Sequence, residues 1–162
     1  MRHILLLITV LLSSVCGALA LSAQTTVSLD GFQSDPEASV EMLADRLTVS
    51  QTDGAARFEG NVVIAQGDMR LSADIVDVTY LEAGGIGRLS ASGSVLLVSP
   101  SDTAQADSAV YDFSARELRM RGNVLLNQGA ISLSADLLTI DLETGGAVME
   151  GRVRTVLPSG SK

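Results

Sequence analysis

The chain has 162 residues, with 11 Lys plus Arg against 19 Asp plus Glu and a formal net charge of −8. An acidic chain lacks the clustered cations that nucleic-acid phosphates need, and a hydrophobic content of 46% excludes a disordered polypeptide. The one His and the one Cys are His3 and Cys16. Once that segment is removed, we expect no His-based catalysis, no disulfide, no cofactor and no His/Cys metal site.

Residues 1–23 are typical of a secretory signal peptide. Arg2 supplies a positive start, an apolar run follows, and small residues precede cleavage points after Ala20 and Ala23. Cleavage at either point would deliver the protein to the periplasm of a Gram-negative bacterium. The alternative is an uncleaved membrane anchor, because residues 4–21 are just long enough to span a bilayer.

The rest of the chain predicts one domain between two short flanks. Residues 24–37 are polar and irregular, with Pro36 near their end, and we expect them to form a flexible lead. The domain is expected to occupy residues 38–158, and residues 159–162 form a short tail.

A repeated unit is the strongest signal in this domain. An Ala-Asp pair recurs at spacings of 29, 33 and 29 residues, and a Gly follows each pair. The aspartates are Asp45, Asp74, Asp107 and Asp136, and the glycines are Gly60, Gly93, Gly122 and Gly151. Repeats of this length indicate a stack of similar supersecondary units.

Each unit alternates apolar and polar residues. Around Gly122, for example, Leu118, Met120, Val124 and Leu126 occupy the even offsets, and Gly122 itself falls on this apolar parity. A strict period of two predicts half-buried strands. The parity changes at each Ala-Asp pair, which predicts a bulge or corner there. We therefore expect an all-β, solenoid-like or jellyroll body. No cap is obvious at either end, so both sheet ends are expected to be open to head-to-tail addition of further strands.

Two segments carry a resemblance to a known family. Gly60-Asn61-Val62, then Gln66-Gly67 and Leu71-Ser72-Ala73-Asp74, resemble the OstA-like family of periplasmic lipopolysaccharide-transport bridge proteins. Gly122-Asn123-Val124, Gln128-Gly129 and Leu133-Ser134-Ala135-Asp136 repeat the same motif. The resemblance covers residues 40–157.

The resemblance implies an open, twisted β-jellyroll of short antiparallel strands whose two sheets enclose an apolar groove. In that picture the acyl chains of lipid A travel in the groove, and the protein carries lipopolysaccharide from the inner to the outer membrane. The implied partners are a same-fold transport protein anchored in the inner membrane, the N-terminal domain of an outer-membrane lipopolysaccharide-assembly barrel, and further copies of this chain, head to tail.

The groove lining is expected among the apolar residues of the alternating strands. These are Val40, Met42, Leu47, Val49, Phe58, Val62, Ile64, Leu71, Val76, Val78, Val95, Leu97, Met120, Val124, Leu126, Leu138 and Ile140. Periodicity alone indicates the packed core of a β domain, and the groove rests on the resemblance.

Other readings stay open at this stage. A non-lipid-binding structural β-solenoid and the membrane-anchored partner of the same fold both fit the repeats. An enzyme fits poorly, because the carboxylates recur one per repeat without a catalytic partner. We expect no calcium at the four aspartates, which are suited to bind local backbone N–H groups. Arg116, Arg119 and Arg121 are interpreted as an outward solvated face, with contact to lipid phosphates or an acidic partner as the alternative.

Overall fold

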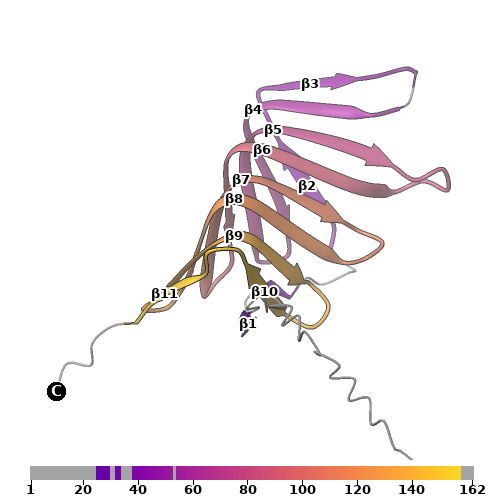
Figure 1. Cartoon of the computed structure of the whole chain (residues 1–162). Coiled ribbons are helices and arrows are strands. Elements are labelled where there is room, and N and C mark those ends of the chain that lie inside the picture. Colours follow the sequence, from indigo (N-terminus) through magenta and orange to yellow (C-terminus); the bar gives the residue numbers. More distant parts are fainter. Residues whose placement is uncertain (1–24, 30–31, 34–37, 53, 158–162) are drawn as a thin grey trace, which may run out of the picture.

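The computed structural model describes residues 25–29, 32–33, 38–52 and 54–157, which form an 11-stranded antiparallel sheet (Figure 1). The predicted all-β fold is confirmed, and no α-helix occurs within those residues. The predicted signal peptide and the tail lie outside them. The strands are β1 (Thr25–Ser28), β2 (Val40–Leu43), β3 (Arg46–Val49), β4 (Ala56–Gln66), β5 (Met69–Tyr80), β6 (Ile86–Val98), β7 (Asp102–Asp112), β8 (Glu117–Gln128), β9 (Ile131–Asp141), β10 (Gly146–Glu150) and β11 (Arg154–Val156).

The strands follow one another across the sheet almost in chain order. The path runs β1-β10-β9-β8-β7-β6-β5-β4-β2, while β3 also pairs with β4 and β11 also pairs with β9. Figure 1 shows the long strands β4 to β9 stacked one above another, each bent at a common ridge. The short strands explain this bend, because β2 and β3 pair with different halves of β4, and β11 and β10 with different halves of β9.

The bend divides the sheet into two arms, which we name after their first strands. The β2 arm contains residues 40–43, 62–66, 69–73, 95–98, 102–106, 124–128, 131–135 and 154–156. The β3 arm contains residues 46–49, 56–59, 75–80, 86–92, 108–112, 117–121, 137–141 and 146–150, with β1 added to β10.

The corners lie at the predicted Ala-Asp pairs, and the structure shows how they form. The register shifts at the corner in every pair of long strands, for example between Ser72 and Ile75 where β5 meets β6. The surplus residue is on the glycine-bearing strand, so that two residues, a Gly and its successor, stand opposite one Asp. Gly60 and Asn61 have φ values of +78° and +45°, which lie in the left-handed region. A β-bulge of this kind bends a strand sharply.

The parity of the glycines misleads about where they face. A Cβ added at Gly60 would lie 2.5 Å from Oδ2 of Asp45, and Asp45 is exposed. The expectation that the Gly belongs to the apolar face is therefore wrong, because the left-handed backbone turns it toward the outer, Asp side of the corner.

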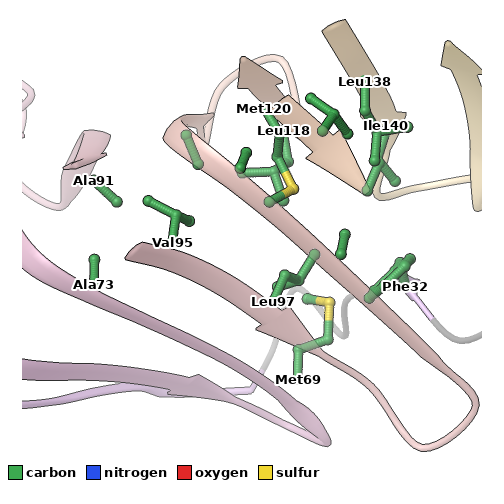
Figure 2. Close-up of a cluster of buried hydrophobic side chains, with 14 of the residues drawn as sticks. Phe32, Met69, Ala73, Ala91, Val95, Leu97, Leu118, Met120, Leu138 and Ile140 are labelled. Atoms are coloured by element: carbon green, nitrogen blue, oxygen red, sulfur yellow. The ribbon is translucent and has the colours of Figure 1, made fainter. Parts of the chain in front are cut away.

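The core lies between the two arms. Most of its buried side chains come from the inner faces of β4 to β10. Figure 2 draws side chains of both arms in one cluster, among them Leu97 of the β2 arm and Leu118 of the β3 arm. Met120, Leu126, Leu138 and Ile140 are fully buried. The alternation that predicted half-buried strands thus produces one continuous apolar interior.

The lead before the domain is not wholly flexible, contrary to our expectation. Residues 25–28 form β1, which pairs with β10, and the Leu29 N–H donates to the Gly145 carbonyl at 2.8 Å. Leu29 and Phe32 are both fully buried, and Figure 2 places Phe32 in the apolar cluster. Two large apolar side chains in a polar stretch are enough to fix it to the domain, since each buried one stabilises it by about 1.5–3 kcal/mol.

The expectation of two open sheet ends is half correct. At one end, β2 and β3 form an edge of the described sheet, and Leu43, Leu47 and Val49 are exposed there. At the other end, β11 is the edge of the β2 arm, but in the β3 arm β1 covers β10. The lead therefore supplies a cap for one arm.

Candidate functional site

The inner face of the bent sheet is the apolar surface that the fold builds. Paired residues form rows across it, and one row of the β3 arm runs Leu47, Phe58, Val76, Ala91, Ala109, Met120, Leu138, Met149. A row of the β2 arm runs Met42, Ile64, Leu71, Leu97, Ala104, Leu126, Leu133. Because paired positions share a face, the repeat places aliphatic side chains along the whole length of the interior.

Most of the predicted lining residues do face this interior. Eleven of them are buried, namely Val62, Ile64, Val76, Val78, Val95, Leu97, Met120, Val124, Leu126, Leu138 and Ile140. Four pack partly buried against the core, namely Val40, Met42, Phe58 and Leu71. Leu47 and Val49 are 55% and 58% exposed, because they sit on the edge strand β3 where neither arm covers them. Contact of any of the seventeen with a lipid stays a prediction.

An apolar cavity lies between the arms. Its volume is about 40 Å³, and its lining is Ile64, Gln66, Met69, Leu71, Leu89, Ala91, Leu97, Ala109, Tyr111, Leu118 and Leu142. Three of these residues, Ile64, Leu71 and Leu97, were among the predicted lining. The others share the inner parity of their strands, apart from Leu142, which follows β9, so the alternation could have identified most of them.

The cavity is too small for an acyl chain as it stands. Its volume is only a few times the roughly 10–15 Å³ that a cavity needs to hold one water molecule. A chain of methylene groups can enter only if the arms separate or the side chains between them move. Tightly packed apolar side chains would otherwise have to be compressed, which is costly.

A polar contact joins the arms beside this cavity. The hydroxyl of Tyr111, near the end of β7 in the β3 arm, donates to Oε1 of Gln66, the last residue of β4 in the β2 arm, at 3.4 Å. The ring of Tyr111 stacks on Phe113, with ring centroids 4.0 Å apart. Both residues lie far from the corner, so this contact holds the arms together on their open side.

The outer face carries the charges. Arg119 pairs with Glu117 at 2.6 Å, and Arg116 with Glu143 at 3.6 Å, on exposed or half-exposed side chains. These neighbours satisfy both cations within the chain, which favours the solvated-face interpretation over a dedicated lipid-phosphate site. Arg57 likewise pairs with Asp77 at 3.0 Å.

Three of the four corner aspartates accept hydrogen bonds from side chains that follow the neighbouring glycine, where we expected local backbone N–H groups. Nδ2 of Asn61 donates to Oδ2 of Asp45 at 2.8 Å, and Nδ2 of Asn123 to Oδ2 of Asp107 at 2.9 Å. At Asp136 the donor is Nε of Arg152, at 3.0 Å, and this hydrogen bond lowers the pKa of Asp136. Within the described part of the chain, no three His, Cys, Asp or Glu side chains gather as metal ligands. The described residues likewise contain no helix long and apolar enough to cross a membrane.

Comparison with known proteins identifies the family to which this bent sheet belongs. A family model described as the LptA/(LptD N-terminal domain) LPS transport protein matches residues 41–146, more than half of the chain. The chain belongs to this family. An uncharacterized protein of Rhizobium meliloti (strain 1021) is 26% identical to it and aligns with 93% of this chain and 87% of its own length.

A solved structure supports the LPS-transport β-jellyroll at the level of the fold. LptH, described as the LptA-homologous periplasmic component of the lipopolysaccharide transport device of Pseudomonas aeruginosa, superposes with a TM-score of 0.69. The match covers 78% of this chain and 99% of LptH at 16% sequence identity. The protein is thus an LPS transport-related β-jellyroll, as the OstA-like motifs predicted.

Proposed function

We propose that this protein is a periplasmic, non-enzymatic carrier that holds the acyl chains of lipopolysaccharide between its two arms and forms part of a bridge from the inner to the outer membrane. The observation that carries the proposal is the apolar interior, continuous from β4 to β10, in a chain of the LPS transport family. The expected signal peptide supports a periplasmic location.

The chemistry of the interior suits a lipid that slides. Exposing acyl chains to water costs about 0.8 kcal/mol per CH₂ group, so a carrier must cover them for the whole crossing. The two rows described above offer similar apolar contacts along the sheet and contain no charged side chain that would fix the lipid in one place. Flexible side chains such as Met69 and Met120 adapt to different chain positions.

The repeat also supports head-to-tail assembly. Along the sheet, corners with Asp alternate with corners with Gly, beginning with Asp45 at the β2/β3 edge and ending with Gly151 between β10 and β11. Asp45 of a second copy would continue this alternation beside Gly151. The same edges would meet the implied partners, a same-fold protein anchored in the inner membrane and the N-terminal domain of an outer-membrane lipopolysaccharide-assembly barrel.

Binding should depend on the acyl chains. The test loads the purified chain with a fluorescent acyl probe and adds either lipopolysaccharide or the same lipopolysaccharide with its acyl chains removed. We expect only the acylated form to displace the probe, because the apolar interior has nothing to offer a bare carbohydrate. Equal displacement by both forms would place binding on the charged outer face, and no displacement by either would favour a structural role.

A further inference from the structure

Strand β1 gives the two arms unequal lengths at the C-terminal end of the sheet. The β2 arm ends at β11, which pairs with β9, whereas the β3 arm continues past β10 to β1. Neighbouring strands are about 4.8 Å apart, so the β3 arm extends one strand spacing further than the β2 arm. At the opposite end the two arms stop level, because β2 and β3 both pair with β4.

This offset matters for a second copy docking through β2 and β3. These strands are joined directly through the corner at Asp45, so they cannot be displaced from one another by a whole strand. With β1 in place, β2 of the second copy would reach β11 while its β3 met β1. Strand alternation would also make that β3 run parallel to β1 in an otherwise antiparallel sheet.

The internal repeat gives the register in which the second copy should pair. Within the chain, Leu47 stands opposite Phe58 and Val49 opposite Ala56, two and four residues before Gly60. The corresponding residues before Gly151 are Met149 and Ala147. A second copy's β3 in this register would therefore place its Leu47 opposite Met149 and its Val49 opposite Ala147.

Those two places are already taken within the chain. Thr25 stands opposite Met149, and Val27 stands opposite Ala147. Both strands have four residues, and the segments Thr25-Thr26-Val27 and Leu47-Thr48-Val49 match in pattern. They would also run in the same direction relative to β10. β1 therefore occupies the position, direction and register that the repeat assigns to β3 of the next copy.

We propose that β1 is a detachable cap that imitates β3 and must leave β10 before a second copy can add to both arms. The proposal rests on the head-to-tail docking proposed above. The residues that follow β1 hold to the domain independently of β1, because Leu29 and Phe32 are fully buried. They can stay in place while residues 25–28 detach. The first chain then remains monomeric until β3 of a second copy displaces the first chain's β1 from β10.

Cysteine pairs distinguish displacement from simple addition. Opposite residues in an antiparallel pair have Cα atoms about 4.5–5.5 Å apart, within the range that a disulfide bridges. The repeat aligns Thr48 of the second copy with Val148, which now faces Thr26. The experiment mixes a Thr48→Cys chain with either a Val148→Cys chain or a Thr26→Cys chain, each starting at Gln24, under mild oxidation, and identifies mixed disulfides by mass.

We expect the Thr48→Cys chain to bridge to Val148→Cys, and the yield to rise about tenfold or more when the Val148→Cys chain starts at Leu29 and so lacks β1. Preferential bridging to Thr26→Cys, or an unchanged yield without β1, would overturn the cap. The control for random collision is a Thr139→Cys chain, because Thr139 of β9 stands opposite Val148 and so lies on the same face but one strand away from the docking edge.

A disulfide that holds β1 on β10 within one chain provides a test that does not depend on removing β1. Oxidised Thr26→Cys/Val148→Cys should lower self-association about tenfold or more relative to its reduced form, by sedimentation velocity. The control is Ser90→Cys/Val110→Cys, an opposite pair in the middle of the same arm. Equal self-association of the locked and reduced forms would overturn the cap. Displacement of the acyl probe by lipopolysaccharide is measured on the same samples. If lipopolysaccharide still displaces the probe while the locked and reduced forms associate equally, the cap is wrong and the carrier function stands. If lipopolysaccharide does not displace the probe either, both proposals are wrong.

Discussion

Oδ2 of Asp45 lies only 2.5 Å from the position that a Cβ at Gly60 would occupy, so the two residues fit together because position 60 has no side chain. The same relationship joins Asp74 with Gly93, Asp107 with Gly122 and Asp136 with Gly151. Each corner of the bent sheet is therefore built from a carboxylate on one strand and a bare backbone on the next.

Replacing a corner glycine should destabilise the fold strongly. In Gly122→Ala, the new methyl group collides with the carboxylate of Asp107, and the backbone must keep a φ of +78°. We expect a loss of about 2–4 kcal/mol in the free energy of unfolding by urea. Gly129→Ala is the matched control, because Gly129 has a φ of +56° but nothing within 4 Å of its added Cβ. It should lose about 1–2 kcal/mol, and equal losses would mean that the Asp contact is unimportant.

Filling the cavity should stabilise the empty protein and hinder lipid entry. Ala109 lines the cavity and is almost completely buried, so Ala109→Val adds two methyl groups where space of about 40 Å³ exists. We expect up to about 1 kcal/mol of added stability, from roughly 24 cal/mol per Å³ of cavity filled, and several-fold weaker displacement of the acyl probe.

The control for this substitution is Ala104→Val. Ala104 is also fully buried but does not line the cavity, and overpacking there should cost about 1–3 kcal/mol in unfolding experiments. If Ala109→Val leaves lipid binding unchanged, acyl chains do not pass through this part of the interior.

The contact between the arms should oppose their opening. Tyr111→Phe removes the hydroxyl that donates to Gln66 while keeping the ring stacked on Phe113. We expect the free energy of unfolding to fall by about 1 kcal/mol and lipopolysaccharide to bind more tightly, because one obstacle to separation is gone. Tyr80→Phe, at a side chain that is 49% exposed, should change neither quantity. Weaker lipid binding by Tyr111→Phe would show instead that the hydroxyl helps to hold the lipid.

Acid should weaken the turn that follows β9. Backbone N–H groups of Thr144 and Glu143 donate to Asp141 and lower its pKa below the usual 3.8. A carboxylate whose pKa is lower in the folded state stabilises the fold above pH about 4, and that stabilisation is lost as the pH falls through the lowered pKa. Asp141→Asn keeps an acceptor without the charge. The stability advantage of the natural chain over Asp141→Asn should therefore be largest near pH 6 and shrink toward pH 2.

Asp141→Ala separates the charge from the hydrogen bonds. This variant lacks the acceptor and should be less stable than Asp141→Asn at every pH. A constant difference between the natural chain and Asp141→Asn across the pH range would contradict the pKa argument, and urea unfolding at several pH values measures it.

The sequence predicted what the repeat encodes. The alternation around Gly122 identified strand faces correctly, and the change of parity at Ala73-Asp74 placed a corner where the register shifts. These features depend on local backbone geometry and on a period of two, both of which can be read directly from the order of residues.

What the sequence did not reveal depends on contacts between distant segments. Phe32 lies in a polar stretch without a period, and its burial follows from the pairing of residues 25–28 with β10. The partner of Asp45 could not be found from neighbouring residues, because Asn61 comes from another strand and approaches only after the bulge has formed. Tyr111 and Gln66 likewise meet only when the two arms fold together.

The central claim is that lipopolysaccharide travels between the arms, and photo-crosslinking in living cells tests it most directly. A photoreactive residue is placed at Ile64, which lines the cavity, and in separate strains at Val63, the neighbour on the opposite face of β4, and at Arg57 on the outer face of the β3 arm. The account predicts lipopolysaccharide adducts at position 64 and not at positions 63 or 57. Adducts at the outer positions alone, or at none of the three in a folded periplasmic protein, would contradict it.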